Sequence, residues 1–150
     1  MGEDSSARWM PAFLAFLHTH ARLWDRVEAD VRQISGLTVA RYDVLVHLDL
    51  AGGRLGLNAL ANAVVLSPSG LSKLLDRMQA AGLIERQPDP DDARATFASI
   101  TPEGRALVRK TRPRHHPFLQ QSFGDVLNDR DLADLIRIMK KLDTQPLREA

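Results

Sequence analysis

The chain has 150 residues, of which 44% are hydrophobic and 26% are charged, and its formal net charge is +1. This length fits one ordinary domain, and the absence of cysteine excludes disulfides and thiol redox chemistry. No apolar run reaches the roughly 18 to 20 residues that cross a bilayer, and the acidic start MGEDSS lacks the order of a signal peptide. We therefore expect a soluble, cytoplasmic protein whose net charge argues neither for nor against nucleic acid.

Two helices are predicted in the first third of the chain. Apolar residues recur at helical spacing from Trp9 to Ile34, which predicts one long amphipathic helix that ends at Gly36. A second helix is predicted through VARYDVLVHLDL, with Thr38 as its N-cap and the pair Gly52-Gly53 at its end. The stretch RLGL that follows could pair as an edge strand.

The middle of the chain carries the clearest boundary signals. NALANAVV is predicted to form a short helix capped by Asn58. In LSPSGLSKLLDRMQAAG, Ser67 is the expected cap, Pro68 takes the first helical position, and Gly82 follows the last turn. The β-prone segments LIERQ and ATFASI flank the loop PDPDDAR and predict a hairpin.

Two further helices are predicted after the hairpin. Thr101 and Pro102 repeat the pattern of a cap followed by proline, whereas Pro113 and Pro117 are expected to bend or break the helix that starts there. Asn128 starts the last helix. The order of elements predicts a mainly α fold with a small β-hairpin wing, which is a winged helix-turn-helix. The helices at both ends lie outside that unit and need another surface to bury their apolar stripes.

The helix predicted over residues 68–81 has two unlike faces at about 100° per residue. The face that should pack on the domain is apolar: Leu71, Leu74, Leu75 and Met78. The other face, with Ser72 at its edge, is small or charged: Ser69, Lys73, Asp76, Arg77 and Ala80. Small residues and two cations suit a helix that lies in a major groove, although a solvated amphipathic helix has the same pattern.

Other chemistries find little support in the sequence. The loop PDPDDAR has three aspartates but neither the glycine nor the final glutamate of a calcium loop. His18 and His20 point to different sides of a helix, and no histidine spacing requires a metal. The chain has no G-x-S-x-G and no P-loop. We therefore expect neither an enzyme nor a bound cofactor or metal.

The segments LTVARYDVLVHL and NALANAVVLSPSGLSKLLDRMQAAGLIERQPDPDDARATFASITPEGRALV, with their flanking helices, resemble the MarR family of bacterial transcription regulators. The resemblance covers nearly the whole chain and is most specific in GLIER, the Asp-x-Arg loop and T-P-E-G-R. It implies a homodimer in which residues 8–36 and 102–146 are dimerisation helices and residues 37–101 are the winged helix-turn-helix.

The resemblance also implies how DNA is bound. Helix 68–81 enters the major groove of a pseudo-palindromic operator, and the wing, residues 87–95, enters the minor groove through Arg94, which Asp92 positions. The expected DNA-binding residues are Ser67, Ser69, Ser72, Lys73, Arg77, Arg86, Asp92 and Arg94. Small aromatic or anionic effectors of the family bind between the two parts, and the candidate residues there are Trp24, Tyr42 and His47.

Two departures and one alternative accompany this interpretation. Ala93 stands where family wings commonly have a basic residue, and the two prolines at 113 and 117 fall in the helix that links the two parts. Residues 54–94 contain five cations and five acids, whereas DNA binding needs a positive face. The favoured function is a dimeric regulator, most often a repressor. The alternative is a winged-helix protein-interaction module that has lost DNA binding.

Overall fold

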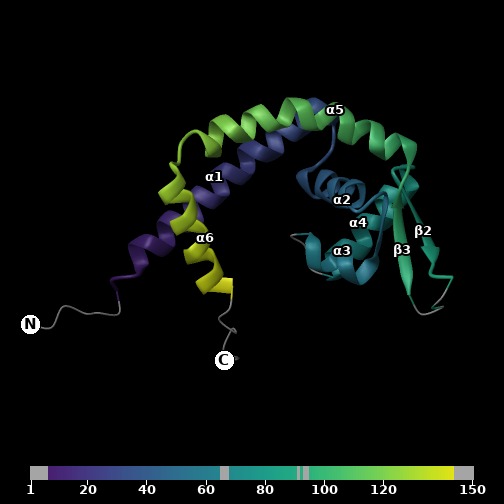
Figure 1. Ribbon diagram of the computed structural model, residues 1–150, viewed down its shortest axis with the longest axis horizontal. Coiled ribbons are helices and arrows are strands. Elements are labelled where there is room, and N and C mark those ends of the chain that lie inside the picture. Colours follow the sequence, from purple (N-terminus) through teal and green to yellow (C-terminus); the bar gives the residue numbers. More distant parts are fainter. Residues whose placement is uncertain (1–6, 65–67, 91, 93–94, 144–150) are drawn as a thin grey trace, which may run out of the picture. The chain divides into compact units, whose positions relative to one another are not determined.

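The computed structural model describes residues 7–64, 68–90, 92 and 95–143. They divide into two compact units, residues 1–115 and 116–150, and each is described by itself. The elements are α1 Met10–Ser35, α2 Val39–Leu50, β1 Arg54–Gly56, α3 Leu57–Ala63, α4 Pro68–Ala80, β2 Ile84–Pro88, β3 Thr96–Ile100, α5 Pro102–Leu119, the π-helix Gln120–Gly124 and α6 Asp129–Asp143 (Figure 1). The mainly helical fold with a hairpin wing is therefore confirmed.

The three strands form one antiparallel sheet in the order β1-β3-β2. The predicted edge strand is confirmed, because Arg54 pairs with Ser99 and no other strand flanks β1 among the described residues. Ile84 pairs with Ile100 in the hairpin. Since side chains alternate along a strand, Ile84 and Ala98 point to the same, buried face of this sheet.

The core of the first unit lies between α2, α3, α4 and that face of the sheet. Its largest fully buried side chains include Leu45, Leu48, Leu60, Leu75 and Met78. These helices gather beside the β2–β3 hairpin in Figure 1. Burying a leucine or methionine side chain stabilises a fold by about 1.5–3 kcal/mol, so this cluster fixes α4 firmly on the unit.

Most predicted helix ends are confirmed. Gly36 and Gly82 end α1 and α4 with left-handed φ angles of 74° and 71°. The Thr38 hydroxyl accepts a hydrogen bond from the Arg41 amide at the start of α2. The Asn128 side chain accepts hydrogen bonds from two amides in the first turn of α6. Each of these helix ends depends on residues within one turn of it, so the local sequence is enough to predict it.

One prediction about helices is wrong, and a second is contradicted in one of its two alternatives. Asn58 does not cap α3, because the chain turns from strand into helix at Gly56 and the helix already includes Leu57. Pro113 and Pro117 do not break α5, which continues to Leu119, so of the expected bend or break only the break is excluded. Both prolines lie on its exposed side, where water can hydrogen-bond to the carbonyl groups that have lost an amide donor. The π-helical turn follows directly after α5.

The segment after α4 and the start of α5 are joined by hydrogen bonds and by a close backbone contact. The Thr101 hydroxyl donates to the Gly82 carbonyl oxygen at 2.7 Å and accepts from the Gly104 amide at 3.1 Å. A Cβ atom on Gly104 would lie well under 3.0 Å from the Leu83 carbonyl oxygen, closer than packed atoms come. The glycine of T-P-E-G-R is therefore required by the close approach of α5 to the end of α4.

Candidate nucleic-acid interface

Helix α4 is held by its apolar side and presents its polar side to solvent. Leu71, Leu75 and Met78 are buried, as predicted, and Leu74 is partly buried. The side chains left exposed are Ser72, Lys73, Asp76, Arg77, Gln79 and Ala80. Ser67, which was also predicted to contact DNA, lies outside the described residues, and so does the side chain of Ser69. The structure thus places Ser72, Lys73 and Arg77 on one exposed helix.

Lys73 and Arg77 lie four residues apart, so their side chains project from neighbouring turns of α4. Among the ion pairs between described residues, none involves either of them. An exposed cation pair on a helix anchored from behind can approach an anionic surface without first breaking an internal salt bridge.

Arg86 differs from these two cations. Its Nη2 atom lies 2.5 Å from Oδ1 of Asp76, and its Nε atom donates to Oε1 of Gln79 at 2.9 Å. The structure therefore brings Arg86 to α4, where its guanidinium is occupied by two side chains. Sequence reasoning missed this contact, because it joins residues on different elements.

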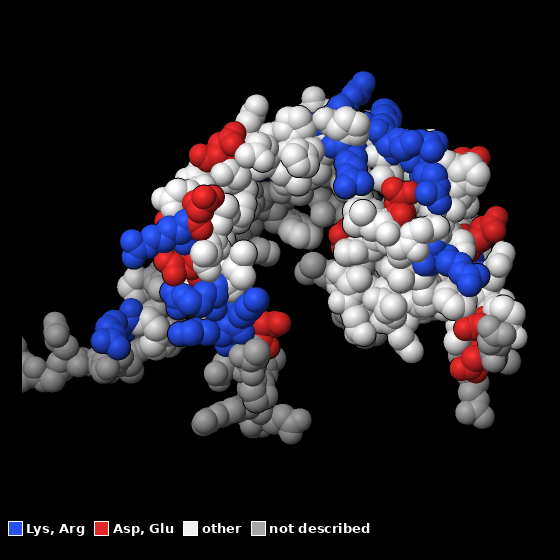
Figure 2. All heavy atoms as spheres, in the orientation of Figure 1, with Lys and Arg blue, Asp and Glu red and all other residues white. Residues whose placement is uncertain are grey.

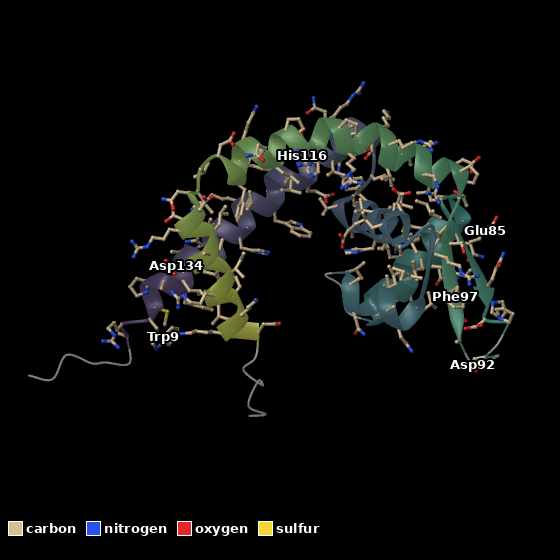
Figure 3. All side chains as sticks on the ribbon, in the orientation of Figure 1. Trp9, Glu85, Asp92, Phe97, His116 and Asp134 are labelled. Atoms are coloured by element: carbon tan, nitrogen blue, oxygen red, sulfur yellow. The ribbon has the colours of Figure 1, made fainter. Side chains whose placement is uncertain are left out.

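The wing tip is closed by backbone hydrogen bonds. The Asp89 amide donates to the Ala95 carbonyl oxygen, and the Ala95 amide donates to the Asp92 carbonyl oxygen, both at 2.9 Å. Asp92 is exposed at the end of the hairpin (Figure 3). Arg94, the predicted minor-groove residue, lies outside the described residues, and so does the predicted contact between Asp92 and Arg94. Acidic side chains gather over this end of the hairpin, whereas cations gather over α5 (Figure 2).

Arg54 is a further cation of the sheet that sequence reasoning did not assign. Its guanidinium carbon lies 4.9 Å from the centre of the Phe97 ring, which suits a cation–π contact. The cross-strand register brings the two together, since Gly56 pairs with Phe97. Figure 3 shows Phe97 on β3. The sequence showed only that an arginine begins a predicted edge strand, and this does not reveal that Arg54 lies over the Phe97 ring.

Comparison with known proteins agrees with this architecture. The sequence model of the MarR family matches residues 35–95. AbsC of Streptomyces coelicolor, a MarR family transcriptional regulator of solved structure, is 31% identical; the match covers 97% of this chain and 99% of AbsC, with a TM-score of 0.83. The chain belongs to the MarR family.

Two further solved structures bear on this MarR-family regulator. Sco3205 of Streptomyces coelicolor, solved in complex with DNA, is 25% identical over 98% of this chain and 94% of its own, with a TM-score of 0.87. Bordetella bronchiseptica BpsR, whose DNA binding is regulated by 6-hydroxynicotinic acid, is 27% identical over 86% and 98%, with a TM-score of 0.66. Membership of a family of transcription regulators confirms the prediction that the chain is not an enzyme.

The three effector candidates of the MarR-family chain have different surroundings. Trp24 is exposed on α1 and stacks on His20, with ring centres 6.1 Å apart. His47 lies 3.4 Å from Asp43 within α2. Tyr42 is buried, and its ring meets the edge of the His115 ring at 5.8 Å. The described contacts therefore do not bring the three together.

Tyr42 belongs to a polar cluster that joins three helices. Nδ1 of the buried His115, on α5, lies 2.6 Å from Oδ2 of Asp30, on α1. Burial raises the pKa of Tyr42 above its ordinary 10.0, and the positive charge of Arg112 partly offsets that rise. The Thr111 hydroxyl, one turn before His115, is buried and has no hydrogen-bond partner among the described residues. The sequence singled out Tyr42 here but gave no specific role to Asp30 or Thr111.

The described part of the chain has neither a metal-binding cluster nor a membrane-spanning helix. No group of three or more histidine and acidic side chains there is arranged to hold a metal ion. None of its helices is both long and apolar enough to cross a membrane.

Proposed function

We propose that this regulator acts as a homodimeric repressor that binds a pseudo-palindromic operator. Residues 37–101 form the DNA-binding part, in which α4 enters the major groove and the wing, residues 87–95, enters the minor groove. Residues 8–36 and 102–146 form the dimerisation helices. The observation that carries the proposal is the exposed pair Lys73 and Arg77 on a helix whose other side is fixed in the core. The DNA-bound structure of the similar Sco3205 also supports it.

The dimer is supported by apolar side chains that remain exposed at both ends of the chain. Along α1 and its N-cap residue, large exposed residues recur at helical spacing and share one face: Trp9, Phe13, Phe16, Leu17 and Trp24. On α6, the exposed apolar residues include Ile136, Ile138 and Leu142. Exposed apolar surface of this kind marks association surfaces in folded proteins, and most oligomers are symmetric homodimers.

An effector of the small aromatic acid class is part of the same proposal. It is supported by the buried Thr111 hydroxyl, which lacks a protein partner among the described residues, and by Arg112, whose charge reaches Tyr42. The similar BpsR is regulated by a ligand of this class. Binding near this cluster would act on the place where α1, α2 and α5 meet.

Selection of bound sequences from random duplex DNA tests the operator. We expect an inverted repeat whose half-site centres are about one helical turn, roughly 10 base pairs, apart.

Fluorescence anisotropy on the selected duplex then tests the proposed contacts of single side chains with DNA. Lys73→Ala and Arg77→Ala should each lower affinity on the order of tenfold and reduce the salt dependence by about one phosphate contact. Arg94→Ala should weaken binding similarly, as should Asp92→Ala through lost positioning of Arg94.

Lys110→Ala is the matched control, because Lys110 is an exposed cation on α5, outside the proposed surface. Equal affinities for the parent, Lys73→Ala and Arg77→Ala would contradict the DNA contacts and favour a protein-interaction module. Adding 6-hydroxynicotinic acid to the same assay, with Tyr42→Phe as the comparison, examines the effector proposal.

A further inference from the structure

The strand that carries Arg86 turns this side chain inward. Along β2, Ile84 is buried, Glu85 is exposed, and Arg86 returns to the face of Ile84. Its partner across the hairpin is Ala98, which is fully buried. Arg86 therefore projects from the face of the sheet that packs on the helices, at the rim of the core. A side chain on this face is poorly placed to reach DNA from the wing.

The guanidinium of Arg86 meets α4 at two points. Asp76 and Gln79 lie three residues apart and so project from adjacent turns of the helix. Nη2 binds the Asp76 carboxylate and Nε donates to the Gln79 amide oxygen. The planar guanidinium can make both contacts in one orientation, which a lysine ammonium cannot do with the same geometry. The two contacts link the exposed side chains of α4 to strand β2 of the wing.

We infer that Arg86 is a positioning residue for DNA binding and that Asp76 is the group it neutralises. This inference rests on the proposed contacts of α4 with DNA. It differs from the sequence-based expectation that Arg86 itself contacts DNA. The side chain of Asp76 is 60% exposed and lies between Lys73 and Arg77 in sequence, so its carboxylate borders the proposed DNA-binding face.

Removing Arg86 would change this face in two ways. The Asp76 carboxylate would stand unneutralised near the phosphates and repel them. It could also pair with Lys73, three residues earlier on the same helix, and withdraw that cation from DNA. Both effects act through Asp76, whereas a direct contact between Arg86 and a phosphate would not depend on Asp76 at all. This difference makes the two roles separable by experiment.

The test is a double-mutant cycle on the full-length chain with the selected operator duplex, read by fluorescence anisotropy at two salt concentrations. Arg86→Gln should weaken binding on the order of tenfold, the size expected for loss of a charged hydrogen bond. Asp76→Asn should bind about as tightly as the parent. In the Asp76→Asn background, Arg86→Gln should cost no more than about threefold, because the charge to be neutralised is gone.

Arg105→Gln is the matched control. Arg105 forms an ion pair of the same kind with Asp49, at 2.7 Å, but that pair links α5 to α2 and has no member on α4. Its loss should leave affinity within about twofold of the parent. Circular dichroism at the assay temperature checks that each variant is folded, and Arg86→Met, which also removes the charge, replaces Arg86→Gln if the latter is not.

Two results separate failure of this inference from failure of the proposed function. An equal loss on Arg86→Gln in the parent and Asp76→Asn backgrounds would show that Arg86 contacts DNA directly and would overturn the inference alone. If Lys73→Ala and Arg77→Ala have no effect on affinity, the major-groove role of α4 fails, whatever the cycle gives.

Discussion

At the residue scale, the same side-chain type takes different roles according to the element and face that carry it. Arg77 lies on the exposed face of α4, Arg86 is turned inward to Asp76 and Gln79, and Arg54 lies over the ring of Phe97. The formal net charge of residues 54–94 is zero, because five cations are matched by five acids. The net charge of this segment matters less than how its charges pair, since the Asp76 carboxylate is bound by the guanidinium of Arg86.

The single tyrosine of the chain allows a direct test of one buried group. Because burial raises the pKa of Tyr42, the folded chain retains this proton at a pH where the unfolded chain releases it. The stabilisation from this group is fully present below the unfolded value of 10.0 and is lost as pH rises from there through the folded pKa. The ultraviolet absorbance of tyrosinate reports Tyr42 alone and should rise at higher pH in folded protein than in urea.

Tyr42→Phe supplies the companion measurement of stability. The free energy of unfolding, measured in urea, should fall less in this variant than in the parent when the pH rises from about 9 to about 11. These two pH values lie below and above the ordinary pKa of tyrosine. A tyrosinate titration with the same midpoint in folded and unfolded protein would show that Tyr42 is not buried as described.

At the scale of the elements, the junction of α4 and α5 depends on one missing side chain. Gly104→Ala places a methyl group against the Leu83 carbonyl oxygen, which belongs to the backbone and cannot rotate away. We expect a loss of about 1–3 kcal/mol in the free energy of unfolding, the usual cost of overpacking, measured by urea denaturation.

Gly124→Ala is the control for that change. The added methyl group would meet only the side chain of Gln120, whose far end can move, so the expected loss is below about 1 kcal/mol. Similar losses for the two variants would show that the approach of α5 to Leu83 is not the cause.

The elements also show where prediction from sequence succeeds and where it stops. Caps such as Thr38 and glycine ends such as Gly82 were predicted correctly, because they depend on residues within one turn. The prediction that Asn58 caps α3 was wrong, because the end of β1 determines where α3 begins, and pairing with β3 sets that end. The Arg86 contacts were missed for a similar reason: they join a strand to a helix, and no local pattern encodes which acid an arginine will meet. The buried contact of His115 with Asp30, 85 residues apart in sequence, is the extreme case.

At the scale of the whole molecule, the proposed dimer accounts for apolar side chains that one chain leaves in water. Phe13 is 47% exposed on the face of α1 that also carries Phe16 and Trp24. Phe13→Glu should therefore convert the dimer to monomer at micromolar concentration, because a desolvated carboxylate in an apolar interface costs several kcal/mol. Light scattering measures the change in mass, and operator affinity should fall with it.

Ala15→Glu provides the control on the opposite side of the same helix, since it lies about 200° around the axis from Phe13. It should leave both mass and affinity unchanged. A parent chain that scatters as a stable monomer would contradict the two-fold operator.

The bonds around Thr101 also bear on how displacement passes through the first unit. The Thr101 amide donates to the Leu83 carbonyl oxygen, and its hydroxyl links Gly82 with Gly104. The residues that directly follow α4 are thus hydrogen-bonded to the residue that precedes α5. If α4 enters the major groove as proposed, we expect a displacement at the start of α5 to pass through these bonds to the residues that end α4, so that the angle at which the helix meets DNA can be adjusted from outside the groove.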